Sequence, residues 1–171
     1  MIIIQTCPAR DFFGTRPDVH LSKQRIMRTL HLCFVALLTT STLFAQQPEI
    51  YSTPEGAIGG YDPVAFFKEG KPVMGKKELI YSWNGAAWNF SSAENLAAFK
   101  ASPEKYAPQY GGWCAYGIAD GHKSPTQAET WTIVADKLYF NYNANVKKRW
   151  AEKQAEYIQK ANKNWPALKK E

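Results

Sequence analysis

Cysteine, histidine and methionine are scarce after residue 45, so the few that are present limit the chemistry the chain could perform. Residues 46–171 contain one cysteine, Cys114, one histidine, His122, and one methionine, Met74. Copper and zinc accept thiolate and imidazole ligands, and Cu(I) also accepts thioethers. Cys114, with His122 or Met74 completing the ligand set, therefore predicts a site for copper or zinc.

Cys114 also admits two interpretations without a metal. As a reactive thiol it could undergo reversible oxidation, although residues 46–171 hold no second cysteine to resolve the product. It could equally be a small buried hydrophobic residue between Trp113 and Tyr116. His122, in a polar loop, could simply be solvated.

The glycines that precede Cys114 predict a close approach of the backbone to another group. Gly111 and Gly112 stand directly before Trp113, and glycine permits contacts that a side chain would block. We therefore expect a ligand loop at residues 111–113, with the ligand near this loop and near the polar loop of residues 119–129. The alternative is a tight turn, since the segment lacks the context of a phosphate-binding loop.

The residue pattern favours binding over catalysis. A Ser-His-Asp triad would have to use His122, and the chain has no G-x-S-x-G nucleophile elbow. Asp62 is interpreted as a helix cap and Asp136 as a turn residue. Trp83, Trp88 or Trp113 could stack on a sugar or another flat ligand, but core packing is the expectation that we adopt for these aromatic residues.

The start of the chain predicts export. Basic side chains within residues 23–28 precede residues 29–45, which lack Lys, Arg, Asp and Glu. That pattern is typical of a signal peptide cleaved after Ala45. A membrane anchor would need about 20 apolar residues, and this run is shorter and rich in hydroxyl groups. Residues 1–26 form an upstream tail, and Met27 is the better start. We expect a periplasmic or secreted protein with no transmembrane span after cleavage.

Cleavage would change the charge balance of the chain. The whole sequence has 21 basic and 15 acidic residues, whereas residues 46–171 have 16 and 13, a net charge of +3. A balance this mild does not indicate a nucleic-acid partner. Cys114 would be the only cysteine left, which excludes an internal disulfide. A chain of this length can bury a stable core without one.

Turn and capping signals predict an α+β fold, a small single domain with two antiparallel hairpins, short helices and a long C-terminal helix. Asn84-Gly85 predicts a hairpin within residues 79–90, and Asp136-Lys137 a second within residues 130–142. Asp62-Pro63 predicts the start of a short helix over residues 63–68, and Ser102-Pro103 predicts the start of another. A capping box formed by Ser91 and Glu94 predicts a helix between these two. An apolar stripe predicts the long C-terminal helix over residues 144–164.

Three motifs carry a resemblance to a known family. D-P-V at residues 62–64, W-N-F-S at residues 88–91 and P-E-K-Y at residues 103–106 are similar to conserved segments of the YHS domain family. The resemblance covers about residues 60–106. Residues 107–166 resemble the C-terminal extension of the exported YHS-domain proteins.

The chain departs from this family at its metal-linked positions. Members attached to heavy-metal-transporting ATPases carry cysteines where this chain has Ala65, Ser91 and Asn95. Alanine cannot ligate, and a hydroxyl or an amide is a poor partner for a thiophilic ion. The family's metal site is therefore not carried over, and Ser91 is expected to cap a helix instead.

These observations predict an exported YHS-domain protein that is a non-catalytic binding or accessory module. The resemblance favours a metal ion, copper or zinc, or a metal-handling protein partner over another small ligand. The alternatives are a thiol-redox protein acting through Cys114 and a purely structural or protein-interaction domain.

Overall fold

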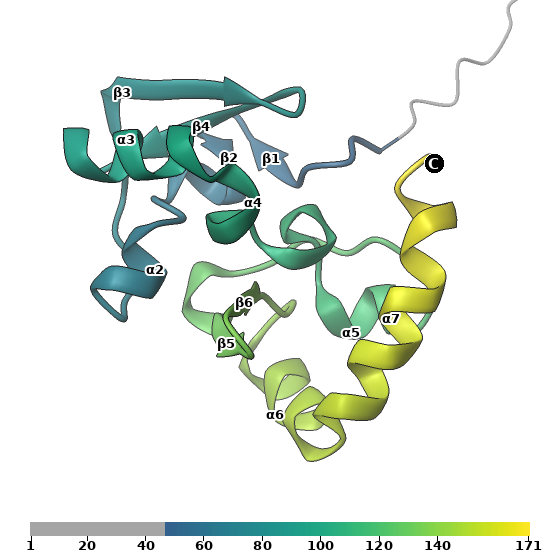
Figure 1. Cartoon of the computed structure of the whole chain (residues 1–171). Helices are drawn as coiled ribbons and strands as arrows, with labels where there is room; N and C mark the ends of the chain where they lie inside the picture. Colours follow the sequence, from purple (N-terminus) through teal and green to yellow (C-terminus); the bar gives the residue numbers. More distant parts are fainter. Residues whose placement is uncertain (1–46) are drawn as a thin grey trace, which may run out of the picture. The chain divides into compact units, whose positions relative to one another are not determined.

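Short hairpins alternate with helices in the computed structural model, which describes residues 47–171 (Figure 1). The elements are β1 (Ser52–Thr53), β2 (Gly56–Ala57), η1 (Ile58–Gly60), α2 (Ala65–Lys68), β3 (Lys76–Trp83), β4 (Ala86–Phe90), α3 (Ala93–Ala101), α4 (Pro103–Tyr106), η2 (Gln109–Gly112), α5 (Ala115–Ala119), η3 (Ala128–Thr130), β5 (Thr132–Val134), β6 (Lys137–Tyr139), α6 (Ala144–Glu152) and α7 (Gln154–Leu168). The predicted α+β class is confirmed. The upstream tail and signal peptide predicted at residues 1–45 lie outside the described residues.

The strands form separate antiparallel hairpins. Strands β3 and β4 meet at Asn84 and Gly85, whose φ angles of 49° and 75° suit the tight turn that Asn-Gly favours. In the second predicted hairpin, Val134 pairs with Lys137, so the turn is Ala135-Asp136 rather than Asp136-Lys137. The β1–β2 hairpin was not predicted, because strands of two residues are too short to show an alternating pattern.

The cap of α3 lies one residue after its predicted position. The hydroxyl of Ser92 accepts a hydrogen bond from the Asn95 backbone N–H at 3.1 Å, so Ser92 is the N-cap. The predicted cap, Ser91, instead donates its hydroxyl to Asp62 at 2.7 Å. The capping-box prediction for Ser91 was wrong because a residue far along the chain already uses its side chain.

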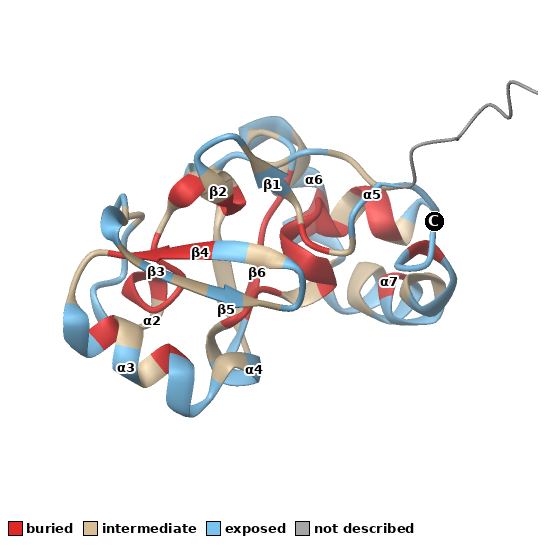
Figure 2. Ribbon diagram, turned by 90° about the horizontal axis from the view of Figure 1, so that it is seen from above, coloured by how far each residue is buried: buried red, intermediate tan, exposed pale blue. Residues whose placement is uncertain are grey.

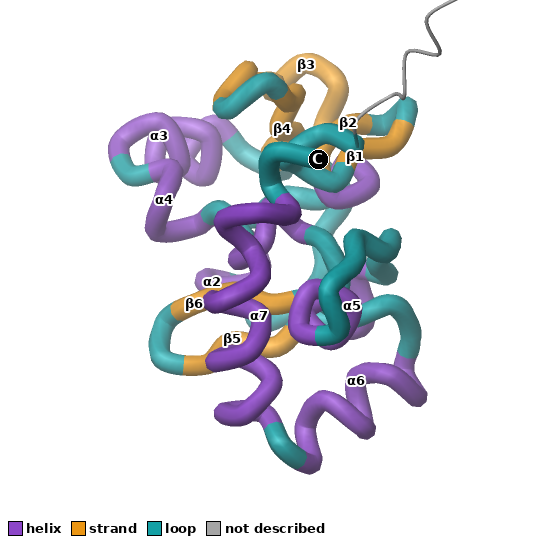
Figure 3. Tube along the Cα trace, turned by 90° about the vertical axis from the view of Figure 1, so that its right-hand side faces the viewer, coloured by secondary structure: helices purple, strands orange, loops and turns teal. Residues whose placement is uncertain are grey.

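The predicted C-terminal helix is two helices. Helices α6 and α7 are separated at Lys153, whose φ of −136° and ψ of 44° are not helical. The apolar stripe continues through the break, because Trp150 and Ala161 are both buried. Periodicity alone therefore could not reveal it. The break redirects the chain, so that α7 runs beside α5 (Figures 1 and 3).

Strand β6 separates two hydrophobic clusters. Leu138 and Phe140 pack with Trp88 and Phe99 in one cluster, and Tyr139 packs with Trp150 in the other. Successive side chains of a strand point to opposite faces, which is how one short strand serves both clusters. Figure 2 shows buried residues along β4 and in α5. None of the described helices has the length and apolarity required to span a membrane.

Candidate functional site

Cys114 is a buried residue at the start of α5. Its side chain is almost inaccessible, with 1 % of the residue exposed. The sulfur accepts hydrogen bonds from the backbone N–H groups of Tyr142 at 3.2 Å and Gly117 at 3.4 Å. Burial raises the pKa of the Cys114 thiol, although these N–H groups act in the opposite direction. The thiol is thus held in its neutral form inside the protein.

The alkaline stability of the protein should reveal this buried thiol. The ordinary thiol pKa is 9.0, so above that pH the unfolded chain loses a proton that the folded protein keeps. Unfolding then releases protons, and the free energy of unfolding should fall as pH rises through this range. Urea titrations between pH 8 and 10 should show a shallower fall for Cys114→Ala. An identical pH dependence for both proteins would mean that Cys114 is not buried as described.

The three predicted metal-ligating residues lie in different environments. Gly117 brings Cys114 and His122 near each other: its N–H contacts the Cys114 sulfur, and a Cβ added to it would lie 3.4 Å from His122 Nε2. His122 is solvent-exposed, and its Nδ1 lies 3.8 Å from Asp120 Oδ2. Met74 is 53 % exposed and pairs with Tyr61. A common site would therefore require Cys114 to become exposed.

Within residues 47–171, no three His, Cys, Asp or Glu side chains are grouped so that they could hold a metal ion.

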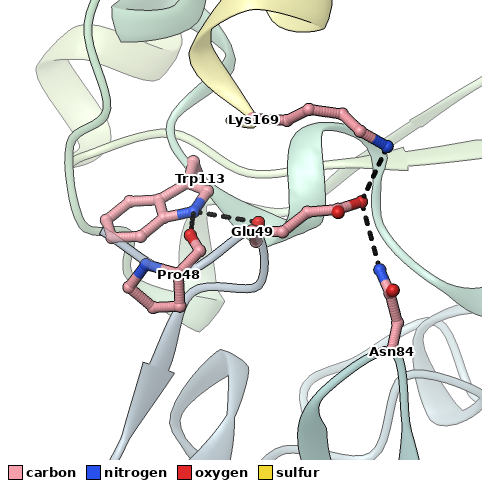
Figure 4. Close-up of polar contacts among 5 residues, drawn as sticks. All are labelled: Pro48, Glu49, Asn84, Trp113 and Lys169. Carbon is pink, nitrogen blue, oxygen red and sulfur yellow. Dashed lines mark hydrogen bonds and ion pairs between the residues drawn. The ribbon is translucent and has the colours of Figure 1, made fainter. Parts of the chain in front are cut away.

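The predicted ligand loop, residues 111–113, packs against the segment of residues 48–51. The Tyr51 N–H donates to the Gly111 carbonyl at 2.9 Å, and a Cβ at Gly111 would overlap the Glu49 carbonyl oxygen. The indole N–H of Trp113 donates to the carbonyls of Pro48 and Glu49, both at 3.1 Å (Figure 4). A Cβ at Gly112 would crowd Ile58. The close backbone approach is therefore made by the chain itself.

Glu49 joins this segment to two distant parts of the chain. Its Oε1 accepts a hydrogen bond from Asn84 Nδ2 at 3.1 Å and lies 3.2 Å from Lys169 Nζ (Figure 4). Asn84 forms the β3–β4 turn, and Lys169 directly follows α7. Sequence reasoning missed Glu49, because these partners are 35 and 120 residues away and no local pattern links them.

A cleft with a volume of about 210 Å³ opens beside Glu49. Its lining comes from four stretches of the chain: Glu49 and Ile50, Trp83 and Asn84, residues 104–111, and Trp165. Within the third stretch, the lining residues are Glu104, Ala107, Pro108, Gln109, Tyr110 and Gly111. Gly111 thus lines a cavity as the ligand-loop prediction requires, whereas Gly112 and Trp113 are not among the lining residues.

Asp62 contacts all three residues that stand where metal-linked YHS domains carry cysteines, Ala65, Ser91 and Asn95. Its carboxylate is fully buried. One oxygen, Oδ1, caps α2 by accepting from the N–H groups of Val64 at 2.8 Å and Ala65 at 3.3 Å. The predicted capping role of Asp62 is confirmed, but α2 begins at Ala65 rather than at the predicted Pro63.

The other oxygen of Asp62 binds Ser91 and Asn95, two of the three residues that stand at the cysteine positions of metal-linked members. Oδ2 accepts from the Ser91 N–H at 2.8 Å, the Ser91 hydroxyl at 2.7 Å and Asn95 Nδ2 at 2.8 Å. The amide oxygen of Asn95 in turn accepts from Lys68 Nζ at 3.2 Å. These groups satisfy one another and include no sulfur, so they do not fit a thiophilic metal ion.

Part of the chain matches a known family of domains. Residues 64–110 match the family model of the YHS domain, so the chain contains a YHS domain. No curated protein and no solved structure matches the chain. The match includes Ser91, Asn95 and part of the cleft lining. Glu49, Ile50, Gly111 and Trp165 lie outside it, so the cleft forms where the YHS domain meets the flanking segments.

Proposed function

We propose that this YHS-domain protein is an exported, non-catalytic binding module that holds a small ligand in the cleft beside Glu49. The observation that carries the proposal is the convergence of four distant stretches of the chain on one cavity. Sites for small ligands are concave, preformed, and lined by apolar and aromatic groups with a few placed polar groups. The cleft combines the aromatic side chains of Trp83, Tyr110 and Trp165 with a comparable share of polar groups. Glu49 joins two of its edges by contacting both Asn84 and Lys169.

The surroundings of the other candidate groups support a binding role over metal or thiol chemistry. The thiol of Cys114 is buried, and the YHS positions that carry cysteines in metal-linked members are bonded to Asp62. Export is supported by the basic and apolar pattern of residues 23–45. N-terminal sequencing of the protein from its native cell should begin near Gln46, and a start upstream of residue 30 would argue against cleavage.

Thiol chemistry at Cys114 is a second candidate. Two backbone N–H groups point at its sulfur, and such donors stabilise a thiolate once it forms. The buried position opposes this function, because a thiol must be accessible to react.

Ligand-dependent stability tests the proposed function. Thermal unfolding of the full chain should be followed with a panel of metal ions, including copper and zinc, and of small organic ligands. A ligand present at about 100 times its dissociation constant stabilises by about 2.7 kcal/mol, which is readily measured. We expect at least one small organic ligand to raise the melting temperature, and Trp83→Ala to remove that increase.

Trp131→Ala is the matched control for this experiment. Trp131 is also half-buried, and it packs against Phe66 away from the cleft lining. Trp131→Ala should therefore lower the melting temperature of the ligand-free protein as Trp83→Ala does. It should leave the ligand-induced rise in melting temperature unchanged. If only copper or zinc stabilises the protein, and Cys114→Ala abolishes that effect, the proposal of a ligand-binding cleft would be wrong and a metal site at Cys114 would be indicated.

A further inference from the structure

We infer that the ligand of the cleft is a neutral sugar unit, bound between Trp83 and Trp165. This inference rests on the proposed function and names its ligand class. A sugar ring presents a face of C–H groups and an edge of hydroxyl groups. It therefore requires a site with aromatic surface, polar groups that both donate and accept, and little net charge.

The aromatic surface comes from two tryptophans on separate elements. Trp83 ends β3 and packs against Trp88 and Phe99, at ring-centroid distances of 6.0 and 5.7 Å. Trp165 lies on α7 and packs against Tyr110 at 6.0 Å. Both are only partly buried and line the cleft. Packing against these neighbours fixes the orientation of each indole. The part of each indole that remains exposed is therefore preorganised to stack on the C–H face of a sugar ring.

The polar groups of the cleft are carboxylates and amides. They belong to Glu49, Asn84, Glu104 and Gln109. Carboxylates accept hydrogen bonds, and amides both donate and accept, which matches hydroxyl groups that do both. The Glu49–Asn84 pair is held in place by Lys169. The planar carboxylate of Glu49 and the planar amide of Asn84 are fixed before the ligand binds. Together they can hydrogen-bond to two neighbouring hydroxyl groups of one sugar ring.

The charge of the cleft favours a neutral ligand over an organic cation. The Glu49 carboxylate lies 3.2 Å from the Lys169 ammonium, and this neighbouring positive charge opposes the binding of a second cation. Glu104 has no ion-pair partner among residues 47–171, but it is exposed, and water screens its charge. The cleft therefore offers hydrogen bonding without a strong field.

The volume of the cleft suits one sugar ring. Its volume of about 210 Å³ is below the roughly 300–1,000 Å³ of sites that enclose drug-sized ligands. A longer saccharide could extend beyond it, with a single unit held between the indoles.

A glycan array followed by calorimetry tests the inference. The full chain is applied to an array of neutral mono- and oligosaccharides, and the strongest hit is titrated by calorimetry beside choline as an organic-cation probe. We expect a saccharide to bind and choline not to bind. Trp83→Ala and Glu104→Ala should each weaken saccharide binding at least tenfold, whereas Trp131→Ala and Glu129→Ala, with side chains outside the lining, should not.

The outcomes separate this inference from the proposed function. Absence of any saccharide hit, or a hit whose affinity is unchanged in Trp83→Ala, overturns the sugar assignment. Choline binding that requires Trp83 and Glu104 would also overturn it, while leaving the cleft as the binding site. A stabilising ligand of any class that is insensitive to Trp83→Ala would instead defeat the proposed function itself.

Discussion

Gly111→Ala is expected to destabilise the protein by about 4 kcal/mol, a loss composed of backbone strain and steric overlap. The φ angle of Gly111 is 61°, a left-handed conformation that costs an L-residue roughly 1–2 kcal/mol. The added Cβ would also overlap the Glu49 carbonyl oxygen. Backbone cannot rotate away as a flexible side chain can, so residues 48–51 must move. The Tyr51–Gly111 hydrogen bond and those from the Trp113 indole depend on that segment.

Gly70→Ala is the matched control for this substitution. Its φ angle is 62°, and a Cβ there would meet nothing within 4 Å. The two variants therefore share the backbone strain and differ in the overlap. Urea unfolding should give a loss about 2–3 kcal/mol larger for Gly111→Ala, and amide exchange at Tyr51 should accelerate only in that variant. Equal losses at the two glycines would show that residues 48–51 do not pack on this loop.

Asp62→Ala is expected to cost about 3–5 kcal/mol of unfolding free energy. The carboxylate accepts five hydrogen bonds while fully buried. Its removal leaves the backbone N–H groups of Val64, Ala65 and Ser91 without this acceptor, and each unsatisfied buried group costs about 1–3 kcal/mol. Asp62→Asn should be nearly as harmful, because an amide nitrogen would face N–H and O–H donors on whichever side it lies.

Asp136→Asn serves as the control for Asp62→Asn. Asp136 is exposed in the β5–β6 turn with a φ of 57°, a conformation that asparagine tolerates well. Its unfolding free energy should change by less than about 0.5 kcal/mol. A small effect of Asp62→Asn in the same urea titration would contradict the hydrogen-bond network. In a separate experiment, uptake of copper or zinc by the Asp62→Cys variant but not by the unmodified protein would show that this region can still hold a metal.

Elements governed by near neighbours could be predicted from the sequence. The Asn84-Gly85 turn and the Asp62 cap each depend on groups within a few residues, and both are present in the structure. The α3 cap was misplaced because the choice between Ser91 and Ser92 depends on Asp62, which is 29 residues from Ser91. The break at Lys153 was missed because helices on both sides of it continue the same apolar stripe.

The candidate site was less predictable than the fold. The glycine pair did indicate a close backbone approach at Gly111, but no local pattern identified the partner, Glu49, which lies 62 residues earlier. The cleft depends on Trp83 and Trp165, which are 82 positions apart in the numbering. Core packing is the ordinary role for tryptophan, and only the folded arrangement shows that these two retain surface toward a shared cavity.

The indole N–H signals of the six tryptophans provide the most direct test of the proposed binding site. In protein labelled with ¹⁵N at tryptophan, the ligand that stabilises most strongly should shift the Trp83 and Trp165 signals along one common saturation curve. Trp131 and Trp150, which are not among the lining residues, should stay in place. A saturating ligand that leaves the Trp83 and Trp165 signals unmoved would contradict the assignment of the cleft as the functional site.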